Sequence, residues 1–409
     1  MHGDERPAPE PFAAFRARDF LLFQLGRMLS TIGMQMQGVA VAWQVYAMTG
    51  RALDLGYVGL AQFLPAFLLS LAAGSVADRF DRRLVLIACH VVLTGSSICL
   101  WLSAGRASVA SIYVVLVFIG ASRAFSGPAG QALMPNLVPT QHFQNAIAWG
   151  SSIWQVAVVV GPAAGGLLYG HSGAGRVYVA AIALELATLL VLILMRSRPT
   201  QPRQTRDARA VVAGVRYVWQ NPIILGAISL DLFAVLLGGA VALLPVYARD
   251  ILHTGPIGLG LLRSAPAAGA IIIAIALAYR PLRRRAGAVM LGCVALFGAA
   301  TIVFGVSHDF TLSLCALLIA GGADMVSVFV RQTLVLLNTP DEMRGRVSAV
   351  SLVFIGASNE LGEFESGLTA AWLGAVPAVV IGGIGTCLVV LVWSALFPDL
   401  RKADQLGGT

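Results

Sequence analysis

Residues 74–83 read GSVADRFDRR, a short polar and basic stretch that separates two long apolar runs, 54–77 and 84–104. Each run supplies the roughly 20 apolar residues that a helix needs to cross a bilayer core about 30 Å thick. Two such runs joined by a tight basic turn predict a helical hairpin that crosses a membrane twice.

The same alternation of apolar runs and short polar turns continues along the chain. Of its 409 residues 57% are hydrophobic and only 12% are charged, whereas a soluble domain has about 25% charged residues. We therefore predict an all-α integral membrane protein. Its twelve predicted transmembrane helices cover residues 19–47, 54–77, 84–104, 108–133, 143–170, 175–196, 222–248, 256–279, 286–306, 309–337, 345–370 and 373–397.

The Lys and Arg residues are distributed unevenly between the two sides that this topology defines. Of the 28, 20 lie in the tails and alternate polar segments, four lie in the opposite loops and four fall within helices. Because cytoplasmic loops are enriched in Lys and Arg, we expect a multi-pass protein of the bacterial inner membrane with both termini in the cytoplasm. The formal charge of +8 then needs no nucleic-acid partner and favours anionic headgroups of the lipid bilayer.

The longest polar stretch divides the predicted helices into two groups of six. Val215 and Val218 in this stretch recur at helical spacing opposite Arg209 and Arg216, the pattern of an amphipathic helix on a membrane surface. We expect a cytoplasmic tail at 1–18, a six-helix bundle at 19–197, a cytoplasmic linker with this amphipathic helix at 198–220, a second six-helix bundle at 221–398 and a cytoplasmic tail at 399–409.

The two halves resemble each other in sequence. Residues 130–150 align with residues 331–351, at an offset of 201, and the alignment matches Gln131, Leu133 and Pro139 with identical residues. Transporters built from repeated bundles bind substrate between the bundles near the bilayer midplane. The alternative is a chance similarity between two apolar helix ends.

The loop at 74–83 resembles the signature of the major facilitator superfamily, Gly-x-x-x-Asp-Arg-x-Gly-Arg-Arg, with Asp81 in place of the usual glycine. The resemblance implies the major facilitator fold and a gating role, in which this loop latches onto neighbouring helix ends in one access state. A carboxylate and paired arginines at helix ends can form such a breakable lock, while the alternative is a basic loop that serves only topology. The matching residues are Gly74, Asp78, Arg79, Arg82 and Arg83.

Two further stretches are typical of the same superfamily. RAFSG at 123–127 resembles its Arg-x-x-Gln-Gly pattern, and GPAAGG at 161–166 resembles its Gly-Pro-x-x-Gly-Gly antiporter motif, although Ala157 replaces an upstream glycine. A proline bends a helix and small residues permit close helix packing. Nearly the whole chain resembles the enterobactin exporter group, which borders macrolide and multidrug exporters. The residues of the expected helix-bending motif are Gly161, Pro162, Gly165 and Gly166.

Acidic side chains inside the predicted helices mark candidate functional positions, because a charge at mid-helix costs about 2.5–3.5 kcal/mol to insert. Of six such acids, Glu185 lies in the first half and five lie in the second: Asp231, Asp324, Glu360, Glu363 and Glu365. Glu360 and Glu363 share one helical face, from which Glu365 points away. We therefore expect proton coupling in the second half, through the candidates Asp231, Asp324, Glu360 and Glu363.

Two arginines inside the predicted helices are candidate partners for these acids. Asp324 and Arg331 lie within about 20° of each other around one helix but about 10 Å apart along its axis. Arg123 aligns with Asp324 in the repeat. We expect Arg123 to bridge Asp324 and Arg331 across the bundle interface, either as a contact that breaks between states or as a static one.

The first predicted helix carries a polar stripe of Arg27, Thr31 and Gln35. We expect these side chains to line a hydrated substrate cavity, with hydrogen bonding between helices as the alternative. His90 on the third helix could either shuttle a proton or pack as a neutral residue. The five cysteines stand singly in apolar segments, so we expect no metal site and no cofactor.

The sequence contains no metalloprotease or nucleotide-binding motif and no convincing nucleophile elbow, so we predict neither an enzyme nor an ATP-driven pump. The resemblance and the buried acids favour a monomeric secondary active transporter. We expect a proton-coupled exporter of a small hydrophobic or amphipathic molecule, siderophore or drug-like, that works by alternating access. The alternatives are an importer or facilitator of a small metabolite, and a non-transporting scaffold or receptor.

Overall fold

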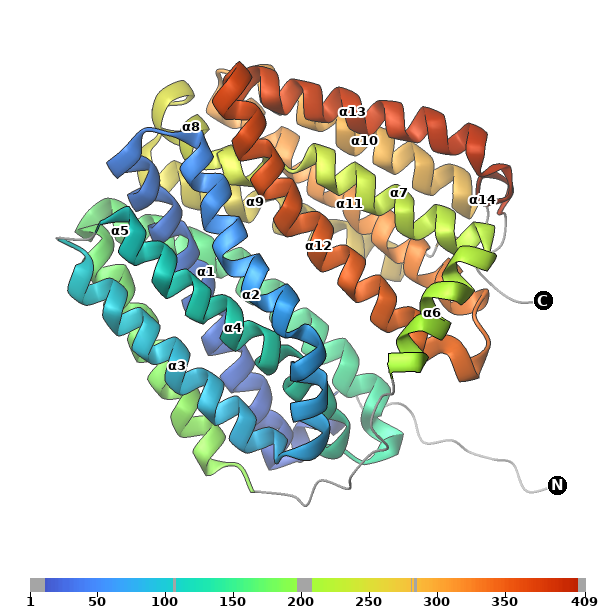
Figure 1. Ribbon diagram of the computed structural model, residues 1–409, viewed down its shortest axis with the longest axis horizontal. Coiled ribbons are helices and arrows are strands. Elements are labelled where there is room, and N and C mark those ends of the chain that lie inside the picture. The colour runs from blue at the N-terminus through green and yellow to red at the C-terminus, as the bar shows by residue number, and fades with distance from the viewer. Residues whose placement is uncertain (1–11, 106–107, 197–207, 281, 283–284, 404–409) are drawn as a thin grey trace.

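The computed structural model describes residues 12–105, 108–196, 208–280, 282 and 285–403, so most of the expected tails and the linker residues 197–207 lie outside it. In the described part of the chain every regular element is helical (Figure 1). The long helices are α1 (Arg18–Thr49), α2 (Ala52–Arg79), α3 (Arg82–Ser103), α4 (Val109–Leu133), α5 (Phe143–Leu194), α6 (Ala208–Gln220), α7 (Pro222–Gly238), α9 (Gly255–Tyr279), α10 (Ala286–Val306), α11 (Phe310–Leu337), α12 (Asp341–Leu373) and α13 (Ala375–Leu396). The short ones are η1 (Ala13–Arg16), η2 (Met134–Asn136), η3 (Thr140–His142), η4 (Ala240–Leu243), α8 (Leu244–Val246), η5 (Tyr247–Ile251) and α14 (Pro398–Lys402).

All twelve predicted spans correspond to helical structure, although the seventh is interrupted. By length and composition, nine helices among the described residues could cross a membrane, and one of these, Thr140–Leu194, is 55 residues long. It contains two predicted spans, because Gly173 breaks the helix with φ 74° and ψ 177°, a conformation that glycine adopts without a Cβ clash. The other two spans are α1 and α12, whose polar and charged residues keep them outside the apolar group of nine.

The seventh span is not the continuous helix that was expected over 222–248. Helix α7 ends at Gly238, and Gly239 has a non-helical ψ of 66°. The chain then continues through the 3₁₀ turn η4, the single turn α8 and the π-helical turn η5. Two consecutive glycines explain the break, since glycine destabilises a helix interior. Turns of the π type recur at functional sites.

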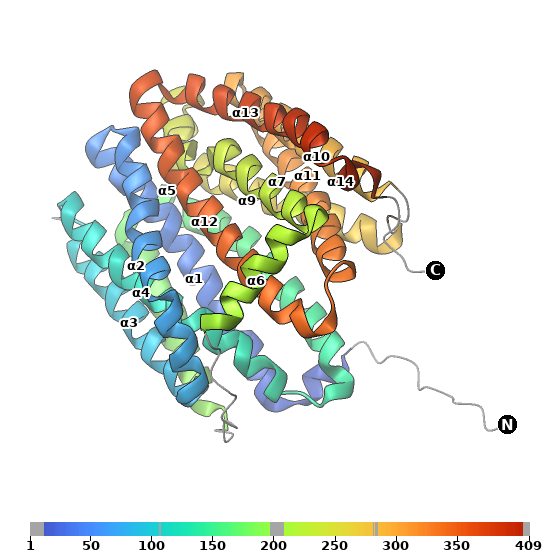
Figure 2. The same ribbon diagram turned by 45° about the vertical axis from the view of Figure 1, so that its right-hand side comes forward.

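The helices form two bundles that meet at one end and diverge at the other (Figures 1 and 2). The N-terminal half comprises α1 to α5, and the C-terminal half comprises α7 to α14. Helix α1 packs along α5 in the first half, and α9 packs along α11 in the second. The two most extensive contacts between the halves are those of α5 with α9 and of α2 with α12. The two views agree on the divergence.

The end at which the halves meet, here called the closed end, holds the turns at Gly50, Thr254 and Gly374. A hydrophobic cluster there combines Val39 and Tyr46 of α1 with residues of the C-terminal half, including Leu243 and Leu259. Polar contacts add to it: the Tyr46 hydroxyl donates to the Asp250 carboxylate, and the Arg249 guanidinium donates to the Tyr46 carbonyl over 3.1 Å. The same guanidinium lies 5.5 Å from the centre of the Tyr46 ring.

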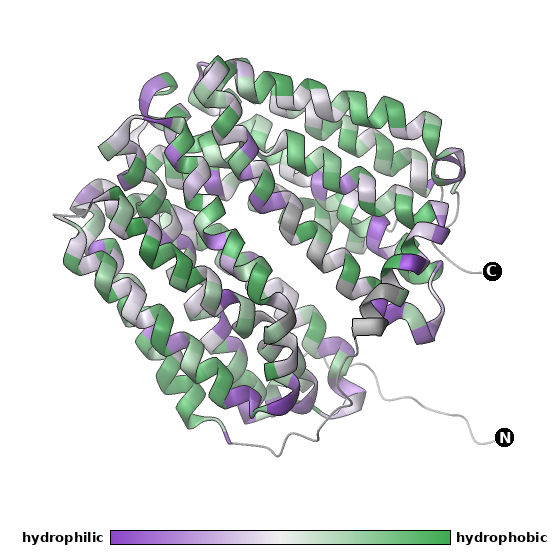
Figure 3. Cartoon of the chain, viewed as in Figure 1, coloured by the Kyte–Doolittle hydropathy of each residue, from purple (hydrophilic) through white to green (hydrophobic). Residues whose placement is uncertain are grey.

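Apolar residues cover most of the helix surfaces, and polar residues concentrate at helix ends and on α12 (Figure 3). The expected amphipathic segment forms α6. Its Val218 is buried in a cluster with Ile224 of α7 and Val347 of α12, so part of its apolar face packs on the C-terminal half. Trp219 instead exposes 68% of its surface.

Candidate functional site

A cavity of about 280 Å³ lies between the two halves. The N-terminal half contributes polar side chains from α1, α2 and α4, among them Gln35, Gln62 and Arg123. The C-terminal half contributes Arg263 of α9 and the acids of α12. Its lining combines apolar side chains with several converging polar groups, and ligand sites combine both kinds of side chain.

Four charged side chains of this cavity come from both halves, and we call them the central charge cluster: Arg123, Arg263, Glu360 and Glu363. The Arg123 guanidinium lies 3.6 Å from the Glu360 carboxylate, which joins α4 to α12 across the interface, and 3.4 Å from the Gln62 amide oxygen. Glu363 packs against α2, since a Cβ at Gly59 would lie 2.9 Å from its Oε2. Glu365 is turned away and accepts a hydrogen bond from Thr369 at 2.7 Å.

The expected bridge between Arg123, Asp324 and Arg331 is wrong. Arg331 pairs with Asp231 of α7, and both side chains are buried within the C-terminal half, with exposed fractions of 3% and 7%. Arg123 contacts Glu360 instead. Asp324 makes no hydrogen bond or ion pair with any described residue. Neither Asp231 nor Asp324 is among the residues that line the cavity, so two of the four expected proton-coupling residues lie away from it.

The polar stripe of the first helix divides in two. Thr31 and Gln35 line the cavity, as expected of them, and Gln37 joins them there. Arg27 is not among the lining residues. Its guanidinium faces α5, where a Cβ at Gly150 would lie 3.5 Å from it. Helical periodicity placed these residues on one stripe, but α5 covers the first part of that stripe.

The GPAAGG segment lies where α5 meets two other helices. A Cβ at Gly165 would lie 2.7 Å from the Met36 Cα of α1, and one at Gly166 would lie 2.5 Å from the Pro256 carbonyl oxygen of α9. The equivalent segment of α12 is similar: Gly362 adjoins Leu236 of α7, and Gly367 adjoins Gly56 of α2. In each half, therefore, one glycine permits close packing within the half and another permits close packing between the halves, while α5 continues as a helix through Pro162.

Replacement of Gly166 with alanine should open the closed end. The added methyl group would overlap backbone atoms of α9, which cannot rotate aside, and such overpacking costs about 1–3 kcal/mol. We expect a longer distance between spin labels at Met48→Cys and Trp372→Cys, measured by pulsed dipolar spectroscopy. Gly175→Ala is the matched control, because a Cβ there would meet nothing within 4 Å. An unchanged distance in Gly166→Ala would show that this contact does not hold the end closed.

The basic loop at 74–83 contacts helix ends within its own half. Arg82 is 6% exposed and donates to the Ala132 carbonyl at the end of α4 over 2.8 Å. Arg83 donates to the Leu192 and Ile193 carbonyls at the end of α5, over 2.8 and 2.7 Å. Cations at helix C-termini are favourable because of the helix dipole. Asp81 caps α3 by accepting from the Arg83 amide.

The other members of this loop are less engaged. Asp78 makes no hydrogen bond or ion pair with any described residue, and Arg79 is exposed. A Cβ at Gly74 would meet nothing within 4 Å. The contacts of this loop are therefore made by Arg82 and Arg83, and the expected role of Asp78 in the latch has no contact to support it in this conformation.

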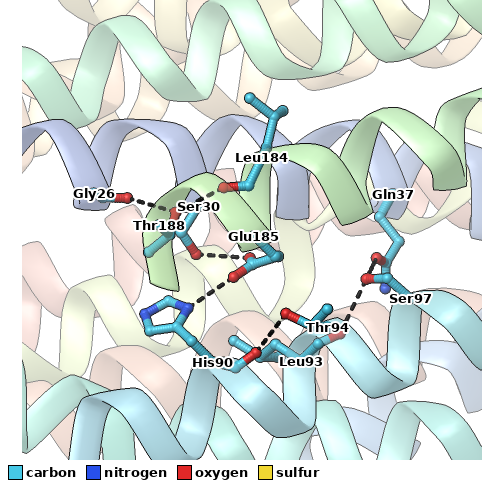
Figure 4. Close-up of polar contacts among 10 residues, drawn as sticks. All are labelled: Gly26, Ser30, Gln37, His90, Leu93, Thr94, Ser97, Leu184, Glu185 and Thr188. Carbon is cyan, nitrogen blue, oxygen red and sulfur yellow. Dashed lines mark hydrogen bonds and ion pairs between the residues drawn. The ribbon is translucent and has the colours of Figure 1, made fainter. Parts of the chain in front are cut away.

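The sequence-based candidates omit a buried polar group in the N-terminal half (Figure 4). Glu185, on the part of α5 that follows Gly173, accepts from the Ser30 hydroxyl of α1 at 2.8 Å and lies 2.7 Å from His90 Nδ1 of α3. Glu185 also lines the cavity. Its position as the single acid in the interior of a predicted helix of the first half was a usable signal, because a buried carboxylate needs partners.

Comparisons with known proteins agree with this architecture. The family described as transmembrane secretion effectors matches residues 9–407. The enterobactin exporter EntS of Citrobacter koseri is 25% identical over 386 residues, which cover 93% of this chain and 92% of that protein. The multidrug efflux pump Tap of Mycobacterium tuberculosis is 27% identical, with 94% of each chain covered.

Solved transporter structures share the fold. A bacterial homologue of the human lysosomal transporter Spinster, in an inward-facing and occupied conformation, superposes with a TM-score of 0.75 at 15% identity, covering 97% of this chain and 98% of that one. A bacterial homologue of the iron transporter ferroportin in an inward-facing state superposes with a TM-score of 0.72 at 15% identity, covering 94% and 98%. At this identity the likeness establishes the fold.

Proposed function

Because the chain belongs to the transmembrane secretion effector family of major facilitator transporters, we propose that it exports a small amphipathic molecule, siderophore or drug-like, in exchange for protons. Export is favoured by the relatives, whose names describe an enterobactin exporter and a multidrug efflux pump. Relatives of both kinds leave the siderophore and the drug-like substrate as candidates to be tested together.

The observation that carries the proton coupling is the central charge cluster. Arg123 of one half and Glu360 of the other meet inside the cavity at 3.6 Å, and Glu363 lines the same cavity. A proton on either carboxylate weakens its attraction to an arginine. Substrate and proton therefore compete for the same carboxylates. When one of them is bound the other is excluded, as proton antiport requires.

We further propose that this conformation faces inward, with both termini in the cytoplasm and the chain acting as a monomer. The basic turn between α2 and α3 and helix α6 lie at the end where the halves diverge (Figure 1), and arginine-rich segments favour the cytoplasmic side. The contacts of Arg82 and Arg83 stay within one half in this conformation. They are then available to gate the diverging end when the halves rock together.

Transport in proteoliposomes tests the proposal. Ethidium serves as the drug-like probe and iron-free enterobactin as the siderophore probe, each measured with and without an imposed pH gradient. We expect at least one of them to accumulate on the side that the gradient favours, and the accumulation to vanish when a protonophore collapses the gradient. Transport that ignores the gradient would contradict proton coupling, and uphill uptake in the inward direction would support the importer.

A further inference from the structure

The N-terminal half contains a second buried ionisable group, the pair of His90 on α3 and Glu185 on α5. Their side chains are 11% and 2% exposed, and Nδ1 lies 2.7 Å from the carboxylate oxygen Oε2. Ser30 donates to the other oxygen, Oε1, at 2.8 Å. Three helices therefore converge on one carboxylate, and both of its oxygens have partners (Figure 4).

The surroundings of the pair contain few other charges. Thr188 donates to the Gly26 and Leu184 carbonyls, and Ser97 donates to Gln37, so these neighbours are neutral. The nearest other ionisable side chains along α1 and α3 are Arg27 and Cys89. Arg27 faces Gly150, and Cys89 directly precedes His90 in the sequence. Glu185 has no described polar partner besides Ser30 and His90.

The pair also forms part of the cavity wall. Glu185 is among the residues that line it, together with Ser97 and Gln37. The charged groups that face it from the cavity are the four members of the central charge cluster. Because Glu185 itself lines the cavity, a change of charge on the pair alters the electrostatic energy of whatever occupies the cavity.

Resting on the proposed function, we propose that the His90–Glu185 pair binds a second proton that is exchanged in each transport cycle. Without that proton the imidazole is neutral, its Nδ1–H donates to the Glu185 carboxylate and the pair has charge −1. With it, Nε2 also carries a proton and the pair is a neutral imidazolium–carboxylate. Nε2 has no hydrogen-bond partner among the described residues.

The pair is coupled to transport through charge. When it lacks the proton, its negative charge attracts a cationic substrate to the cavity, and when it carries the proton this attraction is lost. An amphipathic cation and the second proton therefore exclude each other. The substrate class that this coupling favours is a lipophilic cation, for which ethidium is a suitable probe.

The test is the accumulation of ethidium at equilibrium in proteoliposomes with the membrane potential clamped at zero. Each exchanged proton contributes about a factor of ten for every pH unit of the imposed gradient, equivalent to about 1.4 kcal/mol. Replacing both members, His90→Gln with Glu185→Gln, preserves an amide–amide hydrogen bond but removes the proton site. We expect accumulation to fall by about tenfold per pH unit, while ethidium exchange at equal pH continues.

Controls separate this inference from the proposed function. Thr94→Val is the matched control, since Thr94 donates to the His90 carbonyl of its own helix and lies outside the pair. This variant should accumulate ethidium as the wild type does.

If the double variant does not fold, Glu185→Gln alone serves, because an imidazolium without its carboxylate is disfavoured by burial. Unchanged accumulation, or equal loss of accumulation and of exchange, would overturn the second proton site. A wild type that ignores the gradient would overturn the proposed function itself.

Discussion

Glu363→Gln is expected to lower the accumulation of substrate against a pH gradient, by about tenfold per pH unit, while substrate exchange at equal pH continues. Glu363 lines the cavity and has no hydrogen-bond or ion-pair partner among the described residues, unlike Glu360, which contacts Arg123. It is therefore the carboxylate that is most available to a proton or to substrate. Glutamine keeps its size and its packing against Gly59 but cannot bind and release the proton.

The expected size of this effect is large. Without competition at Glu363, one proton fewer is exchanged for each substrate molecule, so accumulation should fall by the contribution of that proton. For a gradient of one pH unit this is a loss of about tenfold. The loss is equal in size to that of the His90 and Glu185 variants, because each set of substitutions removes a single proton from the cycle.

Glu365→Gln provides the control on the same helix. Glu365 lies two positions further along α12 and accepts a hydrogen bond from Thr369, and it is not among the cavity-lining residues. Accumulation by Glu365→Gln should match the wild type. If Glu363→Gln kept the full wild-type accumulation, the central proton site would instead lie at Glu360, whose replacement Glu360→Gln also removes the ionic partner of Arg123.

The sequence predicted the arrangement of helices better than the partners of the buried charges. Hydropathy located α1 and α12 as spans despite their polar residues, because each predicted run, 19–47 and 345–370, exceeds the roughly 20 residues that a crossing needs. The break at Gly238 and Gly239 was missed because the apolar run continues through it without a change in composition. Local signals report helices well, since hydrophobic length and loop charge are properties of neighbouring residues.

Charge pairing depends on contacts between distant helices, and the sequence contains no direct record of them. Arg331 was assigned to Asp324 because the two share one helix, yet packing brings it to Asp231. Glu185 and His90 were considered separately, although each is the kind of buried group that needs a partner. By contrast, Glu360 and Glu363 both line the cavity, and helical periodicity alone predicts that they share a face.

Asp231→Asn should destabilise the protein more than any other single substitution considered for the C-terminal half. Asp231 and Arg331 form a buried ion pair between α7 and α11, and the Arg331 Nε already lacks an acceptor among the described residues. Removing one partner of a buried pair typically costs about 3–5 kcal/mol, because the remaining charge is left uncompensated. The midpoint of thermal unfolding in detergent should therefore fall markedly. Asp341→Asn is the control, since its pair with Arg344 is largely exposed and such pairs contribute little.

A double variant distinguishes a structural pair from a proton site. Asp231→Leu with Arg331→Met replaces both charges by apolar side chains, and such replacements are often neutral or stabilising. We expect the double variant to recover most of the unfolding free energy and to transport ethidium with the wild-type dependence on the pH gradient, because neither residue lines the cavity. A folded double variant that lost its response to the gradient would return Asp231 to the proton pathway, in conflict with its position away from the central charge cluster.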